Sequence, residues 1–350
     1  MTLDERLKIL NERELKITDE VEQPPICISI TQGENKSIIG TLGNFSMIIG
    51  KAKSRKTYLT SAIAAAVLTN SKILSIEGYL PSNKRTVVYI DTEQGRYHVQ
   101  RVLHRIVNMT NLPKNEHPKN LKFYPMRGVS PKDLVEIVEL AIEKATNLGL
   151  VVIDGIKDLV GSINNENEAT DIMTKLMQLS NFYQIHILIV LHQNKNDLLP
   201  RGHLGTEGQN KAESVITVKK NSQNKDFSIV EADSLRAKEF TPFQFGIGEN
   251  DIPFYDEYDN KENEIKEPKS PKPETIPTDT HTLIVMSAFN KNQEQKYDEC
   301  WKSIKVAAEK YNIKFGINRA KEYLEFYIDE DRQLIIKDGM KYTANKDVLF

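Results

Sequence analysis

The fold of this chain is decided by one short stretch, Gly50-Lys51-Ala52-Lys53-Ser54-Arg55-Lys56-Thr57. It matches the phosphate-loop pattern G-x-x-x-x-G-K-[ST], except that Arg55 stands at the second glycine. Apolar residues before the loop predict a strand, and the Ala- and Leu-rich residues after it predict a helix, over Phe45–Gly50 and Thr57–Asn70. A loop in this setting presents backbone N–H groups and the positive end of a helix to phosphates. The stretch therefore predicts nucleotide binding, with a lysine-rich exposed turn as the alternative.

Outward from this loop, apolar strands alternate with amphipathic helices. The expected strands are Val87–Asp91, Leu121–Pro125, Leu150–Asp154 and Ile187–Leu191, and the expected helices are Arg96–Met109, Pro131–Asn147 and Glu168–Tyr183. Strands that are apolar on both faces and alternate with helices predict a parallel sheet covered on both sides. After these, an antiparallel hairpin is expected from Ser214–Lys220 and Phe227–Ala232, and one more strand over Phe243–Ile247.

Composition limits the class of protein. The chain has 350 residues, a net charge of -2 and 39% hydrophobic residues, so it has enough apolar material for a packed core. It lacks an apolar run of the length that a membrane span needs, and its two cysteines form neither a disulfide framework nor a zinc cluster. A cytoplasmic protein with no membrane partner is expected.

The sequence predicts four segments. Residues 1–25 form a helical arm, 26–254 the α/β domain, 255–279 a charged, proline-rich linker that is not expected to pack, and 280–350 a small α+β domain. The last segment, with three helices and a hairpin turning at Asp338-Gly339, is similar to a winged helix. Its aromatic residues Tyr323, Phe326 and Tyr327 are interpreted as core.

Polar residues at strand ends complete the predicted site. Lys56 is expected at the β- and γ-phosphates, and Thr57 and Asp154 at Mg²⁺. Glu93 is either the base that activates water or an acid that caps the next helix. His192 and Gln193 either sense the γ-phosphate or simply end a strand. The pair Arg236 and Lys238, at i and i+2 on one strand face, is either a set of arginine-finger cations or solvated surface charge.

The ordered motifs GKAKSRKT, VVYIDTE, LVVID, ILIVLHQN and the late RxK resemble the RecA-like ATPase core over residues 26–250. The group is that of the RepA-, DnaB- and RadA-type ATPases, in the form found in bacterial mobile elements and plasmids. The resemblance implies ATP and Mg²⁺ as cofactors, Glu93 as catalytic base and Arg236 and Lys238 as fingers acting across subunits. The residues it implies at ATP are Gly50, Lys51, Ala52, Lys53, Ser54, Arg55, Lys56, Thr57 and Tyr58.

The resemblance also implies DNA-facing loops at Gly161–Glu168 and Lys195–Gly208. The first loop carries no cation, and the second offers Lys195, Arg201 and His203. Two hypotheses follow. One is an ATP-hydrolysing, DNA-associated ATPase of helicase or translocase type that serves replication or mobilisation of a mobile element and forms a homo-oligomeric, possibly hexameric, ring on single-stranded DNA. The other is a nucleotide-binding adaptor or regulator without motor activity. Residues 280–350 are equally suited to bind DNA or a replication or mobilisation partner.

Overall fold

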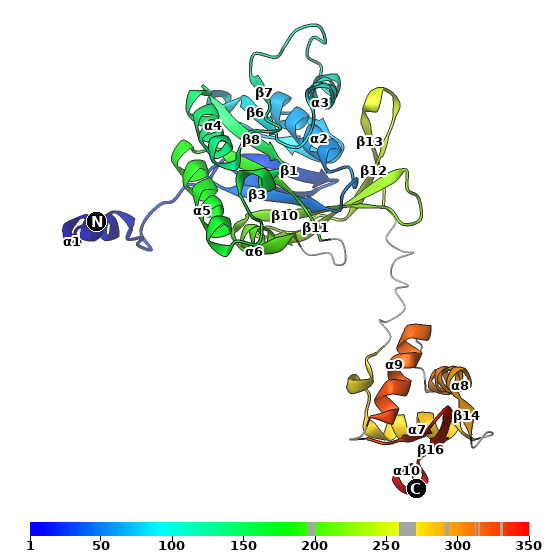
Figure 1. The fold of residues 1–350 in the computed structure, drawn as a ribbon. Helices are drawn as coiled ribbons and strands as arrows, with labels where there is room; N and C mark the ends of the chain where they lie inside the picture. The colour runs from blue at the N-terminus through cyan, green and yellow to red at the C-terminus, as the bar shows by residue number, and fades with distance from the viewer. Residues whose placement is uncertain are drawn as a thin grey trace. The chain divides into compact units, whose positions relative to one another are not determined.

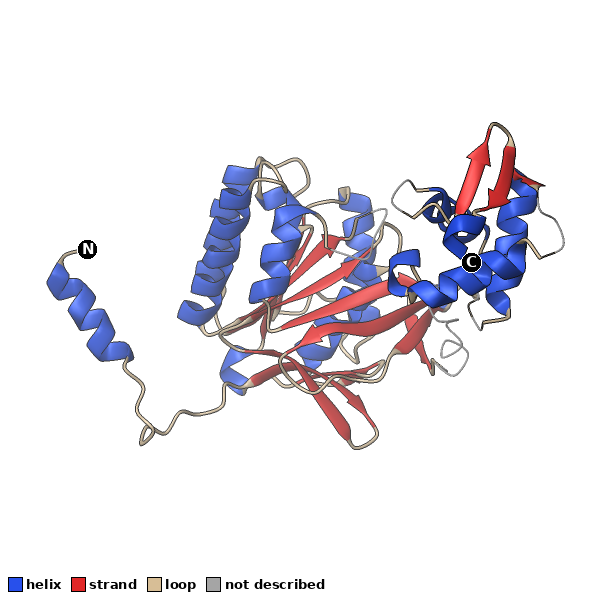
Figure 2. Cartoon of the chain, turned by 90° about the horizontal axis from the view of Figure 1, so that it is seen from below, coloured by secondary structure: helices blue, strands red, loops and turns tan. Residues whose placement is uncertain are grey.

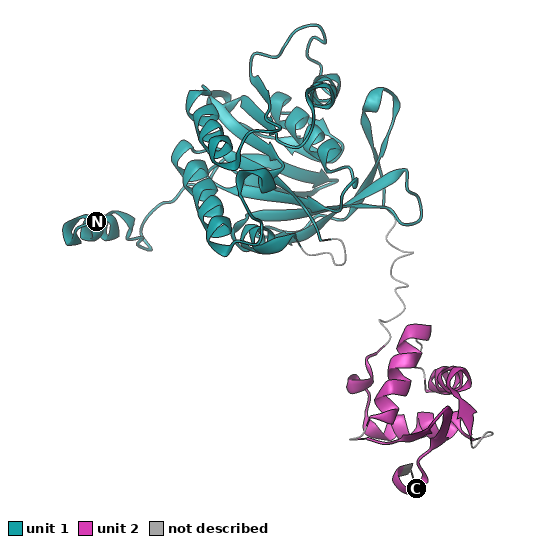
Figure 3. Cartoon of the chain, viewed as in Figure 1, with its two compact units in different colours: residues 1–258 teal, residues 259–350 magenta. Residues whose placement is uncertain are grey.

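The computed structural model describes residues 1–194, 200–258, 271–290, 294–311, 313, 316–329 and 332–349. The chain divides into two compact units, residues 1–258 and 259–350 (Figure 3). The described residues include no helix that is both long and apolar enough to cross a membrane.

A nine-stranded sheet forms the centre of the first unit, in the order β13-β12-β11-β10-β3-β9-β8-β6-β7. The strands from β10 to β7 run parallel, and β11, β12 and β13 add to β10 as antiparallel neighbours. This confirms the predicted fold class, a parallel sheet flanked by helices with later antiparallel strands (Figure 2). The strands are β3 (Phe45–Gly50), β6 (Thr86–Asp91), β7 (Leu121–Pro125), β8 (Leu148–Asp154), β9 (His186–His192), β10 (Ser214–Lys220), β11 (Phe227–Leu235), β12 (Phe243–Ile247) and β13 (Pro253–Asp256).

Helices cover both faces of this sheet (Figure 1). They are α2 (Lys56–Thr69), α3 (Arg96–Asn108), α4 (Pro131–Lys144), α5 (Glu166–Tyr183) and α6 (Gly202–Lys211), with short 3-10 turns at Ser82–Lys84, Ile156–Leu159 and Glu249–Asp251. Alternate side chains of β3 enter different cores: Ile48 packs on the side of α2 and α3, and Met47 and Ile49 pack on the side of α4, α5 and α6. The sheet is therefore buried on both faces, as its apolar strands require.

A second sheet was not predicted from the sequence. It has the order β2-β1-β5-β4, from β1 (Ile26–Gln32), β2 (Asn35–Thr41), β4 (Lys72–Ile73) and β5 (Ile76–Gly78). Its residues Ile28, Ile30 and Ile39 are fully buried in the core that α2 and α3 share. Before it lies α1 (Leu3–Arg13), which begins at a capping box between Thr2 and Glu5 and buries no residue.

The described residues of the second unit form four helices, the last of a single turn, and a small antiparallel sheet of order β14-β16-β15. The elements are a 3-10 turn at Pro273–Thr275, α7 (Thr278–Ala288), β14 (Gln295–Lys296), α8 (Tyr297–Glu309), α9 (Ile317–Ile328), β15 (Ile335–Asp338), β16 (Lys341–Ala344) and α10 (Lys346–Leu349). Tyr323 and Tyr327 are fully buried, which confirms that the aromatic residues of α9 belong to the core.

The predicted linker is wrong at both of its ends. Before it, β13 extends to Asp256 and pairs with β12. After it, Pro273 is buried, and its carbonyl oxygen lies 2.9 Å from His281 Nε2. Tyr323 also donates to the Pro271 carbonyl oxygen at 3.1 Å. Prolines here supply rigid carbonyl acceptors to a buried core, which composition alone does not reveal. Residues 259–270, the rest of the predicted linker, lie outside the described residues.

Candidate functional site

The phosphate loop leaves β3 at Gly50 and enters α2 at Lys56. A Cβ atom at Gly50 would lie 2.3 Å from the Val218 carbonyl oxygen, so only glycine allows the loop to pass so close to β10. Two loop residues have left-handed backbones, Lys53 with φ 63° and Arg55 with φ 73°. The second glycine of the pattern therefore corresponds to a left-handed residue, and Arg55 adopts this conformation in spite of its side chain.

Arg55 is held by the turn between β10 and β11. Its guanidinium donates to the carbonyl oxygens of Asp226 and Lys225. The side chain also lines the nucleotide pocket described below. The arginine therefore ties the phosphate loop to the antiparallel hairpin, which is a role that its place in the motif does not indicate.

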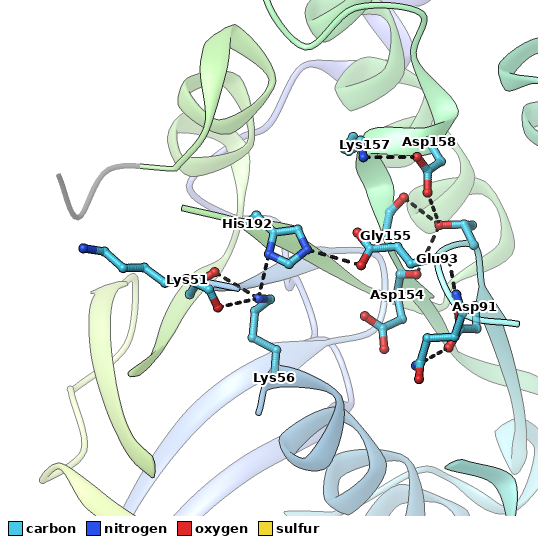
Figure 4. A network of polar contacts seen from close by, with 12 residues as sticks. Lys51, Lys56, Asp91, Glu93, Asp154, Gly155, Lys157, Asp158 and His192 are labelled. Atoms are coloured by element: carbon cyan, nitrogen blue, oxygen red, sulfur yellow. Dashed lines mark hydrogen bonds and ion pairs between the residues drawn. The ribbon is translucent and has the colours of Figure 1, made fainter. Parts of the chain in front are cut away.

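Lys56 is buried at the base of the loop. Its Nζ donates to the carbonyl oxygens of Gly50 at 2.9 Å and Lys51 at 3.1 Å. It also lies 3.0 Å from Nδ1 of His192. Burial lowers the pKa of Lys56, and the negative charges of Asp154 and Glu93 oppose this shift. The ammonium is therefore directed at the loop interior and at the end of β9 (Figure 4).

Glu93 is paired with His192 and does not cap a helix. His192 Nε2 lies 3.2 Å from Glu93 Oε2, while the N-cap residue of α3 is Gly95, with no side-chain cap hydrogen bond. A lysine ammonium only donates, so Nδ1 of His192 accepts from Lys56 and Nε2–H donates to Glu93. This hydrogen bond lowers the pKa of Glu93, against the effect of burial. Lys56, His192 and Glu93 thus form one continuous polar chain (Figure 4).

Asp91, which sequence reasoning missed, fixes the position of Glu93. Its carboxylate accepts from the backbone N–H of Glu93 at 3.1 Å, and from the backbone and side chain of Gln94 at 2.8 and 2.7 Å. Asp91 is fully buried, and burial raises its pKa. The acid two residues before Glu93 in the motif VVYIDTE was the signal that could have identified it.

Asp154 lies beside the phosphate loop at the end of β8. Its carboxylate accepts from Tyr89 at 2.9 Å and from the hydroxyl of Thr57. Burial and the nearby charge of Asp91 raise the pKa of Asp154 to about 6. The hydroxyl and carboxylate oxygens of Thr57 and Asp154 are hard donors of the kind that Mg²⁺ prefers. These two residues therefore fit a magnesium ion shared with a phosphate.

A second missed group braces the strand ends. Thr92 donates to the Gly155 carbonyl oxygen and to Asp158 Oδ2, each at 2.9 Å. Gly155 has φ 116°, and a Cβ atom there would lie 2.1 Å from Thr92 Oγ1. This contact holds the segments after β6 and β8 together, so that Glu93 and Asp154 keep their separation.

A pocket of about 510 Å³ opens over these groups, and Lys53, Arg55, Lys56, Thr57, Tyr58, Glu93, Asp154 and His192 are among its lining residues. Its far wall is an ion-pair cluster around Asp251 in the turn between β12 and β13. Asp251 contacts Arg101 at 2.6 Å and Arg105 at 3.1 Å, and it accepts from the hydroxyl of Tyr58 at 2.8 Å. Arg105 also lies 3.7 Å from the centre of the Tyr58 ring. The turn between β12 and β13 therefore forms part of the pocket wall.

The remaining predicted residues lie elsewhere. Gln193 is buried and forms an isolated β-bridge with Pro200. Of the two sensor candidates, only His192 is among the described residues that line the pocket, so His192 faces the site. The placement of Arg236 and Lys238 on a strand face is wrong, because β11 ends at Leu235. Leu235 pairs with Ser214, the first residue of β10, so both cations lie at the opposite end of the sheet from their own phosphate loop.

Both predicted DNA loops are shorter than expected. Helix α5 begins at Glu166, and Glu168 accepts from the backbone of Gly161 and Ser162, so its carboxylate is used within the loop. The second loop is wrong over its later part, because α6 begins at Gly202 and includes His203. Arg201 stands directly before α6, and Lys195 lies outside the described residues.

Fold and loop together define the class, an α/β domain with a phosphate loop between strand β3 and helix α2. Residues 31–197 match the family model of the AAA domain. Among solved structures, the RadB recombinase matches with 15% identity and a TM-score of 0.43, over 62% of this chain and 92% of that one. A search of curated proteins finds no match.

Proposed function

We propose that the chain is an ATP-hydrolysing, DNA-associated ATPase of helicase or translocase type, which serves replication or mobilisation of a mobile genetic element from the cytoplasm. The observation that carries the proposal is the chain Lys56–His192–Glu93 facing the nucleotide pocket. A carboxylate that lines this pocket and is oriented by His192 can accept a proton from an attacking water. His192 reports on the phosphate that Lys56 contacts, because one imidazole touches both residues.

Magnesium ATP is the proposed ligand. Lys56 would contact the β- and γ-phosphates, backbone N–H groups of residues 50–55 would surround them, and Thr57 and Asp154 would hold Mg²⁺. The bound ion would neutralise charge on the transferred phosphoryl group. Lys56 must leave the carbonyl oxygens of Gly50 and Lys51 to reach a phosphate, so we expect ATP to reorganise the polar chain around His192.

The test is steady-state ATP hydrolysis by the full chain, with and without single-stranded DNA. We expect hydrolysis that DNA stimulates, that Glu93→Gln reduces by at least a hundredfold with ATP binding retained, and that Lys56→Ala abolishes together with binding. ATP binding without turnover in the unaltered chain would reject the proposal. It would favour the nucleotide-gated adaptor, which the inward-bonded Lys56 also supports.

We also propose that the chain acts as a homo-oligomeric ring, in which Arg236 and Lys238 act on the nucleotide of a neighbouring copy. Their position at the opposite end of the sheet from Gly50 supports this, since they lie away from their own pocket. Mixing inactive Lys56→Ala chains with inactive Arg236→Ala chains is expected to restore part of the ATPase activity, because some interfaces then combine an intact loop with an intact finger. No recovery in mixed oligomers would refute action across subunits.

A further inference from the structure

A fully buried tyrosine lies behind the two residues that fit magnesium. Tyr89 is the fourth residue of β6, and its side chain enters the core on the side of α2 and α3. Its ring stacks on that of Phe123 in β7, with the ring centroids 4.6 Å apart and the planes at 10°. A phenol hydroxyl at this depth needs a hydrogen-bond partner. Because the stacked ring fixes the direction of the hydroxyl, that partner must come from a neighbouring element.

The hydroxyl of Tyr89 has two partners. It donates to Asp154 Oδ2 at 2.9 Å, and it lies 2.9 Å from Thr60 Oγ1 in α2. Thr60 also donates to the carbonyl oxygen of Thr57 at 3.1 Å. Tyr89 and Thr60 are both fully buried. A buried set of hydroxyl groups therefore connects Thr57 with Asp154 from inside the core.

Strand register brings the phenol to this carboxylate. Strands β6 and β8 pair in parallel, with Tyr89 opposite Val152 and Asp91 opposite Asp154. Residues two apart in a strand share one face, so Tyr89 points to the same face of the sheet as Asp91. Its long side chain then reaches one residue pair along β8, to Asp154. A phenylalanine at position 89 would fill the same space without making this bond.

Asp154 needs a donor at this place because two carboxylates lie side by side. Asp91 is fully buried and Asp154 is 6% exposed, so both have lost most of the water that would solvate them. A buried carboxylate needs hydrogen-bond donors to offset that loss. Asp91 accepts three bonds from Glu93 and Gln94. Tyr89 provides the corresponding support to Asp154 from the core.

We propose that Tyr89 is a positioning residue for the magnesium ion, which holds the Asp154 carboxylate in the orientation that the ion requires. Asp154 lines the nucleotide pocket, and Tyr89 is not among the described residues that line it. The hydroxyl therefore orients the carboxylate without occupying the pocket. The proposal rests on the proposed function, because it takes Thr57 and Asp154 as magnesium ligands, and it adds a residue outside the phosphate loop.

The test removes the hydroxyl and keeps the ring, in the variant Tyr89→Phe of the full chain. Mn²⁺ serves as the probe because it prefers the same oxygen ligands as Mg²⁺. It is titrated in the presence of the β,γ-imido analogue of ATP, and electron paramagnetic resonance measures the free ion. We expect the affinity for Mn²⁺ to fall by about ten- to a hundredfold, as is typical when a partner of a metal ligand is lost. Calorimetric titration of the analogue in EDTA is expected to give the affinity of the unaltered chain.

Two variants provide matched controls. Tyr327→Phe also removes a buried phenol hydroxyl, which lies 3.0 Å from His281 Nδ1 in the second unit. Thr60→Val removes the other hydroxyl beside Tyr89 and leaves the donation to Asp154 in place. Both controls are expected to bind Mn²⁺ like the unaltered chain. Thermal unfolding without nucleotide checks that each variant is folded.

A Tyr89→Phe chain that binds Mn²⁺ as tightly as Tyr327→Phe would overturn this inference and leave the proposed ATPase standing. Equal losses with Mn²⁺ and in EDTA would show a distorted pocket and would also overturn it. A loss of the same size in Thr60→Val would do so too, because the bond to Asp154 would then not be the cause. An unaltered chain that binds no Mn²⁺ with the analogue would overturn the inference together with the proposed magnesium site.

Hydrolysis provides a second measurement. The Mg²⁺ concentration that gives half of the maximal rate is expected to rise in Tyr89→Phe by the same factor as the loss of Mn²⁺ affinity. The rate at saturating Mg²⁺ is expected to return to that of the unaltered chain, because the hydroxyl acts only through the position of Asp154. A lower rate that no Mg²⁺ concentration restores would refute a positioning role limited to the ion.

Discussion

Because the backbone at Arg55 is left-handed, we predict that glycine is more stable than alanine at this position, which reverses their usual order. A residue with a side chain costs about 1–2 kcal/mol in this conformation, and glycine does not. Glycine loses part of this advantage, about 0.4–1 kcal/mol, because it increases the freedom of the unfolded chain. Arg55→Gly is therefore expected to be more stable than Arg55→Ala by about 1 kcal/mol.

The stability of each variant relative to the unaltered chain also depends on the side-chain contacts that the variant loses. Both variants lose the bonds from Arg55 to the carbonyl oxygens of Lys225 and Asp226. For a partly exposed group we take about 1 kcal/mol for this loss. In Arg55→Gly, removal of the backbone strain roughly offsets this loss. The stability of this variant is therefore expected to be close to that of the unaltered chain. Arg55→Ala retains the strained backbone and is expected about 1 kcal/mol less stable.

Differential scanning calorimetry of the full chain provides the assay, on the transition of residues 1–258. A difference of about 1 kcal/mol corresponds to about 2–4 °C in a domain of this size. The control is Lys132 in the first turn of α4, an exposed position in a right-handed helix. There the order is expected to reverse, with alanine more stable than glycine by up to about 1 kcal/mol. If alanine is also the more stable residue at position 55, the left-handed assignment is wrong.

Two further predictions concern the site. The raised pKa of Asp154, about 6, means that the folded chain retains a proton that the unfolded chain releases near pH 4, so this group reduces stability as pH rises from about 4 to 6. Asp154→Asn should therefore raise the unfolding temperature by an amount that grows over this range; unfolding curves that stay parallel with pH would contradict it. Gly155→Ala should cost about 2 kcal/mol or more in chemical unfolding because of the contact with Thr92. Gly33→Ala, with φ 59° but open space, should cost only the smaller backbone strain, and equal losses would exclude the contact as the cause.

The parallel sheet could be predicted from the sequence because its strands are apolar on both faces. The sheet of β1, β2, β4 and β5 could not, since β4 and β5 have only two and three residues, and β1 buries the polar Ser29 beside the apolar Ile28. Its pairing also joins residues distant in the chain, with Ile28 opposite Gly78. Local periodicity carries no information on such contacts. For the same reason, the packing of Pro273 against His281 was hidden by a composition typical of linkers.

Within the site, the loop, Glu93, Asp154 and His192 were predictable as candidates, but the contacts that join them were not. The motif identifies Lys56 and Glu93 as candidates, yet the imidazole that joins them comes from β9, about a hundred residues after Glu93. The role of Arg55 was likewise undetermined, because its partner carbonyl groups belong to a hairpin turn whose position depends on the whole sheet.

Strand register explains why His192 faces the nucleotide pocket and Gln193 does not. Strands β3 and β9 pair in parallel with Gly50 opposite His192, which places the imidazole directly beside the start of the phosphate loop. Successive side chains of a strand point to opposite faces, so Gln193 is directed away and its backbone N–H donates instead to the Gly50 carbonyl oxygen at 3.1 Å. A one-residue slip of β9 would exchange the two residues and place an amide against Lys56 and Glu93. The residue that joins Lys56 and Glu93 is therefore determined by the apolar packing of Ile187, Ile189 and Leu191 on the opposite face of β9, since that packing fixes the register of the strand.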